Sequence, residues 1–91
     1  MKLHWNSIAY DQLQEIRDKL AETSLKYAQQ LTDELIAKSQ ELIEQPRMGR
    51  MLPESNLPQV REVFVGKYRM VYFVGDFQVE ILAVFHQAQR R

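Results

Sequence analysis

Cysteine is absent from this 91-residue sequence, and glycine and proline occur only three times each. Without cysteine there are no disulfides, no thiolate catalysis and no sulfur-ligated metals, which is compatible with a reducing cytoplasm. The two histidines, His4 and His86, come with no evident cluster of carboxylates, so zinc binding is not expected. We therefore expect a cytoplasmic protein with neither metal nor cofactor.

The sequence also lacks a long apolar run. The longest uninterrupted one, residues 81–85, is far shorter than the roughly 20 residues of a membrane-spanning helix. No basic-then-apolar segment typical of an export signal opens the sequence. Hydrophobic residues make up 45% and charged residues 26% of the chain, an ordinary globular composition. The length fits one domain spanning residues 1–91.

Net charge is the third absence, because twelve Lys and Arg balance twelve Asp and Glu. The balance hides an asymmetry: residues 1–45 hold eight acids and five bases, and residues 46–91 hold seven bases and four acids. A neutral chain lacks the broad positive field of a protein that binds nucleic acid mainly through phosphates. The basic second half can still contact an acidic partner locally.

Two amphipathic helices are indicated in the first half. Apolar residues recur at helical spacing over residues 9–20 and again over residues 28–43. Asn6 before the first segment and Ser24 before the second provide N-cap oxygens, and Pro46 is a natural stop. The short connection between the segments predicts a helical hairpin.

The second half is typical of strands. Residues 46–59 hold all three prolines and predict an irregular connector. Residues 60–65, 68–74 and 78–86 are rich in Val, Ile, Phe and Tyr, and residues 1–5 can form a further short strand. We therefore predict an α+β domain of order β-α-α-β-β-β, with the helical hairpin packed on one face of an antiparallel sheet.

The predicted turns fix which side chains share a face of the sheet. A two-residue turn places Val65 opposite Tyr68, and the next hairpin places Tyr72 opposite Val79. A four-residue second loop would shift the pairs of that hairpin without changing their faces. The face expected to cover the helices carries Val63, Val65, Tyr68, Met70, Tyr72, Val79, Ile81, Ala83 and Phe85. The opposite face carries Glu62, Phe64, Arg69, Val71, Phe73, Gln78, Glu80, Leu82, Val84 and His86. Tyr68 and Tyr72 are therefore assigned to packing rather than to proton transfer.

The second of these faces mixes apolar side chains with charges and is too apolar to remain fully in water, so we interpret it as a docking surface. Arg69 lies near its middle and His86 at the end of the last strand. The simpler alternative for Arg69 is a cross-strand salt bridge with Glu80 or Glu62, and for His86 a strand end without chemistry.

Four segments, in order, carry a resemblance to a known family. They are AYDQL at residues 9–13, PRMGR at 46–50, VREVFVGKYRMVY at 60–72 and VEILAVFHQAQR at 79–90. Together they resemble the helix opening, the connector and the strands of the RelE/ParE toxin superfamily, over essentially the whole chain. The resemblance implies the toxin of a bacterial type II toxin–antitoxin pair, a growth inhibitor associated with plasmid stabilisation and held inactive by a cognate antitoxin.

The resemblance leaves two activities open. ParE-like members poison DNA gyrase, whereas RelE-like members cut mRNA on the ribosome. We favour the gyrase inhibitor, because the chain is neutral and Lys67 is the only lysine among residues 46–91. In the alternative, an endoribonuclease, Arg69 stabilises the scissile phosphate, His86 protonates the leaving oxygen, and Glu62 or Glu80 accepts the 2′-hydroxyl proton.

The expected partner is an acidic, amphipathic antitoxin that adds a helix across the helical hairpin or a strand at a sheet edge. DNA gyrase is the expected target, with the ribosome and mRNA as the alternative, and no membrane is involved. The residues predicted to bind target or antitoxin are Arg47, Arg50, Arg61, Phe64, Arg69, Phe73, Leu82, His86 and Arg90.

Overall fold

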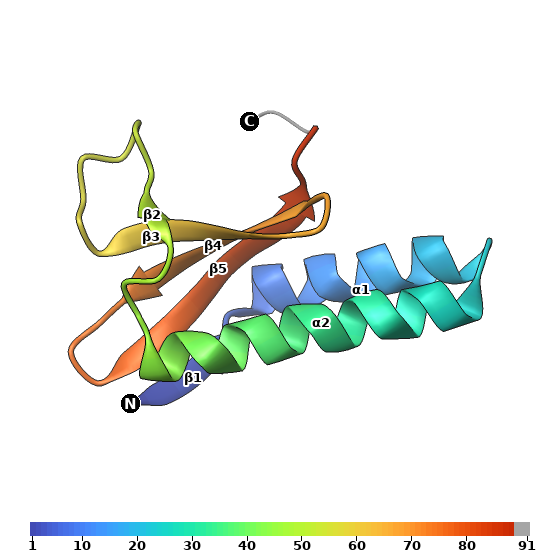
Figure 1. Cartoon of the computed structure of the whole chain (residues 1–91), viewed down its shortest axis with the longest axis horizontal. Helices are drawn as coiled ribbons and strands as arrows, with labels where there is room; N and C mark the ends of the chain where they lie inside the picture. Colours follow the sequence, from blue (N-terminus) through green and yellow to red (C-terminus); the bar gives the residue numbers. More distant parts are fainter. Residues whose placement is uncertain (89–91) are drawn as a thin grey trace.

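Two helices lie side by side against one face of a five-stranded sheet in the computed structural model, which describes residues 1–88 (Figure 1). In chain order the elements are β1 (Lys2–Trp5), α1 (Ser7–Ala21), α2 (Leu25–Glu44), β2 (Arg50–Met51), β3 (Val60–Val65), β4 (Tyr68–Val74) and β5 (Gln78–His86). The predicted α+β class and element order are confirmed. The predicted connector, however, contains the two-residue strand β2.

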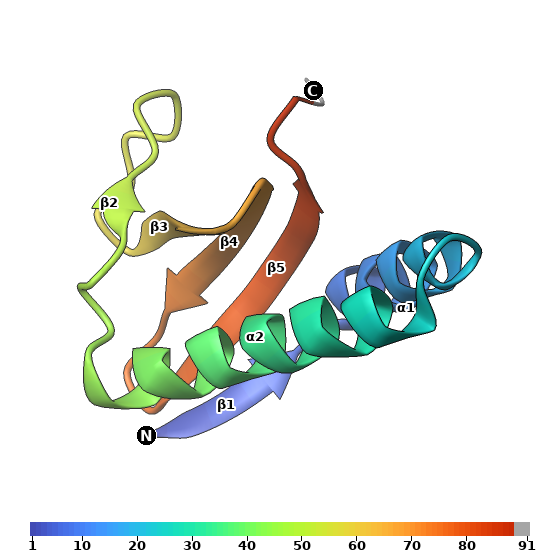
Figure 2. The same ribbon diagram turned by 45° about the vertical axis from the view of Figure 1, so that its right-hand side comes forward.

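Both helices begin where side-chain oxygens can satisfy their first free amides. The Asn6 side chain accepts a hydrogen bond from the Ala9 amide at 2.8 Å, and Ser24 Oγ accepts one from the Tyr27 amide at 3.1 Å. The second helix ends at Glu44, two residues before Pro46. Figure 2 shows the turn between α1 and α2 projecting away from the sheet.

The sheet has the strand order β1-β5-β4-β3-β2. Its neighbours β2 to β5 pair antiparallel, as predicted, but β1 runs parallel to β5. The prediction of a wholly antiparallel sheet is therefore wrong at one edge. A strand followed by a helical hairpin can return to the sheet in either direction, and the sequence of β1 does not determine which.

The predicted register holds in the first hairpin, and in the second the predicted faces hold up to a bulge in β5. Val65 pairs with Tyr68 as expected, and the second hairpin closes with the four-residue loop, so that Tyr72 pairs with Ile81. A β-bulge then interrupts the ladder, so that Val71 pairs with Ala83 and Leu82 is the extra residue. A single extra residue reverses the faces of every residue that follows it in the strand.

The main core lies between the helices and the sheet. Tyr72 is buried in it and Tyr68 packs against it, as predicted for both tyrosines. Trp5 packs against this core, and its indole nitrogen donates to Ser39 Oγ at 3.3 Å. The buried members are Ala9, Leu13, Leu31, Leu35, Leu42, Val63, Val65, Met70, Tyr72, Val79, Ile81 and Val84, with Tyr68 partly buried beside them.

A second, smaller apolar cluster covers part of the opposite face. Leu52, from the segment after β2, packs there with Val71 and Phe85. Ala83 and Phe85 were predicted on the helix side and Val84 on the opposite side, and all three predictions are wrong because of the bulge. The sheet face away from the helices, which we call the outer face, is therefore partly covered rather than bare. Neither helix is long and apolar enough to cross a membrane within the described residues.

Candidate functional site

The connector between α2 and β3 is held against the sheet by the Tyr72 hydroxyl. This hydroxyl donates to the Pro46 carbonyl at 2.7 Å and accepts from the Gly49 amide at 2.9 Å. In the next peptide group, Arg61 Nη1 donates to the Gly49 carbonyl at 2.8 Å. The segment that carries Arg50 is thereby fixed by three hydrogen bonds, although it has little regular structure.

Gly49 has to be a glycine because the sheet approaches its α-carbon closely. A β-carbon at this position would lie 2.5 Å from the Glu62 carbonyl oxygen and 2.6 Å from the Tyr72 hydroxyl. Neither neighbour can yield easily, since one is strand backbone and the other is a fully buried side chain. The glycine thus brings the connector close enough for Arg50 to reach Glu62.

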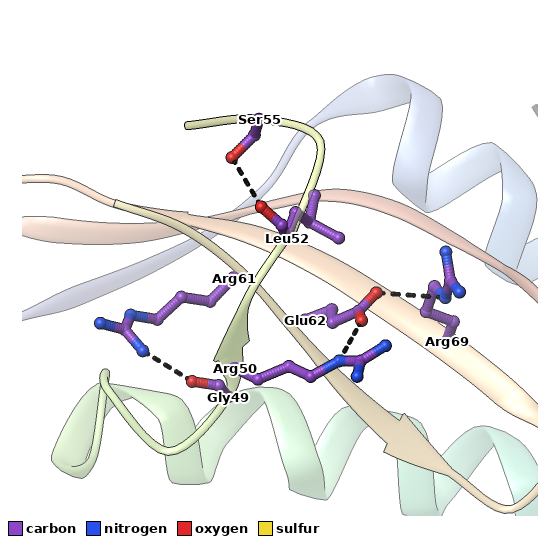
Figure 3. A network of polar contacts seen from close by, with 7 residues as sticks. All are labelled: Gly49, Arg50, Leu52, Ser55, Arg61, Glu62 and Arg69. Carbon is purple, nitrogen blue, oxygen red and sulfur yellow. Dashed lines mark hydrogen bonds and ion pairs between the residues drawn. The ribbon is translucent and has the colours of Figure 1, made fainter. Parts of the chain in front are cut away.

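Glu62 is the central residue of the outer-face site, and Figure 3 shows it between Arg50 and Arg69. Its side chain is completely buried. Arg50 Nε contacts Glu62 Oε2 at 2.6 Å, and Arg69 Nε lies 3.1 Å from Glu62 Oε1. A buried carboxylate is strongly disfavoured unless it is paired, so both arginines are needed around it. The simpler alternative for Arg69, a cross-strand salt bridge with Glu80 or Glu62, is confirmed with Glu62 as the partner.

The two ion pairs differ in quality. The Arg50 contact is also a hydrogen bond, whereas Arg69 Nε and Glu62 Oε1 have no hydrogen-bond partner among the described residues. The distance between Arg69 and Glu62 is that of an ion pair, but the directions of donor and acceptor are unfavourable. Charge attraction depends on distance more than on direction, so we treat Arg69 as ion-paired and Arg50 as the stronger hydrogen-bond donor.

Aromatic rings lie against the same guanidinium groups. The central carbons of the Arg50 and Arg69 guanidinium groups lie 5.6 Å and 5.8 Å from the Phe64 ring centroid, and that of Arg69 lies 5.5 Å from the Phe85 centroid. These distances are in the range of cation–π attraction. Glu62 and the rings therefore restrict both arginines, and we call Arg50, Glu62, Phe64 and Arg69 the arginine clamp.

His86 does not join this site, contrary to the prediction that it shares a face with Arg69. It pairs with Tyr68 across the strands, and the two rings meet edge to face with centroids 5.2 Å apart. Both side chains line a groove of about 520 Å³ on the helix side, together with Ile16, Leu20 and Val84. The bulge in β5 causes this reversal, since it moves His86 to the face opposite Arg69.

Burial raises the pKa of two tyrosines on the helix side of the sheet. For Tyr72, burial outweighs the Gly49 amide and the Arg61 charge, which both lower the pKa. For Tyr68, burial is the main cause and the neighbouring Tyr27 adds to it. Both phenols are therefore protonated at neutral pH and act as hydrogen-bonding or packing groups.

The other predicted residues lie in different surroundings. Phe64 and Phe73 are exposed on the outer face, and Leu82 is partly buried there as the bulge residue. Arg61 instead holds the Gly49 carbonyl, and its buried Nε has no hydrogen-bond partner among the described residues. Arg47 is exposed in the connector, and the prediction for Arg90 lies outside the described residues.

Sequence reasoning missed two features of the site, the burial of Glu62 and the anchoring by the Tyr72 hydroxyl. The only signal for them was a glycine between two arginines in a connector, which indicates close backbone approach but not its partner. Within the described residues, no group of three or more His, Asp or Glu side chains is arranged to hold a metal ion.

A helical hairpin packed on a five-stranded sheet with this order of elements is the RelE/ParE-like fold. The model of the family "ParE toxin of type II toxin-antitoxin system, parDE" matches residues 3–91. The chain therefore belongs to the ParE toxin family of type II toxin–antitoxin systems.

Solved structures support the same fold. A chain of the chromosomal ParDE TA system from P. aeruginosa superposes with a TM-score of 0.79 at 20% identity, over 94% of this chain and 95% of that chain. A chain of the toxin–antitoxin complex RelBE2 from Mycobacterium tuberculosis gives a TM-score of 0.60 at 20% identity, over 93% and 95%. No curated protein matches the sequence.

Proposed function

We propose that this protein inhibits bacterial growth by acting on DNA gyrase and that a cognate antitoxin neutralises it. The family match over residues 3–91 carries this proposal. The neutral net charge supports a protein target over a surface of ribosomal RNA, which attracts proteins with a strong positive field.

The alternative, ribosome-dependent cleavage of mRNA, requires a general acid near the phosphate-binding arginine. His86 was the candidate acid, and it lies on the helix side of the sheet whereas Arg69 lies on the outer face. The other component, the Glu62 carboxylate, is fully buried and already paired with two arginines. The separation of these groups argues against the alternative.

The antitoxin we propose is acidic and amphipathic, because the surfaces it can cover are basic or apolar. On the helix side, the groove lined by Ile16, Leu20 and Tyr68 can take the apolar face of a helix. At the sheet edges, β1 and β2 each have one unpaired side and can accept a strand.

The order in which macromolecular synthesis stops after induction tests the target. We expect incorporation of labelled thymidine to fall first, with RNA and protein synthesis falling later, because a gyrase inhibitor blocks replication before translation. Co-expression of the antitoxin gene should restore all three.

Protein synthesis stopping first, with DNA synthesis continuing, would reject the gyrase proposal and favour the RNase. In that case His86→Ala and Arg69→Ala test the residues themselves. Transcript cleavage that persists in both variants would remove them from the mechanism.

A further inference from the structure

The two arginines of the clamp contact Glu62 through the same atom of their guanidinium groups. Both ion pairs use Nε, with Arg50 on Oε2 and Arg69 on Oε1. A guanidinium has five N–H donors in a planar fork, so contact through Nε leaves the terminal nitrogens available for a second anion. Figure 3 shows the terminal nitrogens of both arginines directed away from the Glu62 carboxylate. In Arg50, 62% of the side chain is exposed.

The clamp is organised before any ligand arrives. Glu62 holds both Nε atoms next to one carboxylate, and the Phe64 ring lies against both guanidinium groups. The Gly49 peptide next to Arg50 is fixed by Tyr72 and Arg61. Restricting a long side chain in advance lowers the entropy cost of binding, so the clamp is better suited to an anion than two free surface arginines would be.

Exposed apolar side chains adjoin the clamp on the outer face. Phe64 is 41% exposed and Phe73 37%. Phe64 lies on β3 and Phe73 on the neighbouring strand β4, and alternation along each strand puts both on the face that carries Glu62 and Arg69. Cations next to exposed apolar side chains are typical of a surface that binds a protein segment of opposite charge.

A nucleic-acid strand fits this surface less well than an acidic protein segment. Base stacking needs a free aromatic face, and the Phe64 ring already has two guanidinium groups against it. Glu62 also cancels one of the two positive charges of the clamp. A single carboxylate that accepts hydrogen bonds from both arginines matches the remaining charge.

We propose that the arginine clamp binds a carboxylate of the antitoxin, with apolar side chains of the same segment lying on Phe64 and Phe73. Edge strand β2 makes this geometry accessible, because a strand added beside it would place alternate side chains on the outer face next to Arg50. In this arrangement Glu62 is a positioning residue that orients both arginines. The inference rests on the antitoxin partner of the proposed function and is independent of the gyrase target.

Titration calorimetry of the full-length protein with the product of the small acidic reading frame expected beside its gene tests the clamp. Arg50→Ala should weaken binding at least about tenfold, because it removes a charge-assisted hydrogen bond. Arg50→Lys should recover little of this loss, since an ammonium lacks the fork that serves Glu62 and the ligand together. Arg50→Ala leaves the buried Glu62 carboxylate paired with Arg69, so thermal unfolding checks that each variant is folded before the affinities are compared.

Arg17→Ala is the matched control, because it removes one partly exposed arginine that pairs with Asp18 on α1. It should change the affinity by less than about threefold, as expected for a surface charge. Glu62→Gln keeps the shape of the side chain but removes its charge, and should weaken antitoxin binding although it does not contact the antitoxin.

Antitoxin affinity of Arg50→Ala equal to that of the unchanged protein would overturn the inference. It would also be overturned if single-stranded DNA or RNA 20-mers bound the protein and only this binding depended on Arg50. The same preparations are assayed for gyrase inhibition. Weakened antitoxin binding without any effect on gyrase would reject the proposed target and leave the clamp in place.

Discussion

Tyr72 illustrates how much can depend on one hydroxyl group in a small domain. Its ring is completely buried in the core, and its hydroxyl bonds two backbone groups of the connector. The connector in turn positions Arg50, which donates a hydrogen bond to the buried carboxylate of Glu62. A core residue is in this way linked to the surface that we propose for antitoxin binding.

Replacing Tyr72 with Phe should lower the free energy of unfolding by about 1–3 kcal/mol, because a buried amide and carbonyl lose their common partner. Urea unfolding measures the change. Tyr10→Phe on exposed α1 is the control and should have almost no effect. Equal stability of the Tyr72→Phe variant would show that the hydroxyl does not hold the connector.

Alkaline pH should weaken the fold through the same hydroxyl. Folding raises the pKa of Tyr72 above its usual 10.0. The neutral phenol therefore stabilises the fold fully at pH values below 10.0, the pKa in the unfolded chain. The contribution is lost as pH rises through the raised pKa, because the unfolded chain then ionises more readily. Urea midpoints should therefore fall above about pH 10, and less so in Tyr72→Phe. An identical decline in both proteins would contradict this, since Tyr68 would then account for all of it.

Strand β5 shows where prediction from sequence succeeds and where it stops. Strand positions and the register of the β3–β4 hairpin followed from alternation and a two-residue turn. The bulge did not, because residues 81–85 are all apolar and fit either face equally well. The parallel pairing of β1 with β5 and the two-residue β2 also depend on long-range contacts that local patterns do not encode.

The same limit explains what was predicted of the site. The pairing of Arg69 with Glu62 could be foreseen, because the two residues lie on β4 and β3, which pair without a bulge. His86 was placed on the wrong face because it follows the bulge. The role of Arg61 in the connector could not be predicted, since it depends on a contact with Gly49, twelve residues away.

Deleting Leu82 tests the bulge directly. Without the extra residue, Val84 would move out of the main core and Phe85 into it, so we expect the free energy of unfolding to fall by more than about 3 kcal/mol. Leu82→Ala keeps the chain length and only trims a partly buried side chain, so it should cost clearly less. Urea unfolding measures both free energies of unfolding. Similar decreases in the two variants would argue against Leu82 as the extra residue of a bulge.

The whole molecule has two distinct surfaces on opposite sides of its sheet. One is the groove between α1 and the sheet that contains Tyr68 and His86, and the other is the arginine clamp on the outer face. Their separation argues against an assembled nuclease site with Arg69 and His86. It is compatible with a toxin whose action depends on protein contacts.

Purified gyrase tests the proposed function most directly. Adding the protein to gyrase, relaxed plasmid and ATP should stop supercoiling and leave linear DNA once gyrase is digested away, and mixing the protein with its antitoxin beforehand should prevent both effects. Complete supercoiling in the presence of a large molar excess of folded protein, with no linear DNA, would contradict the account.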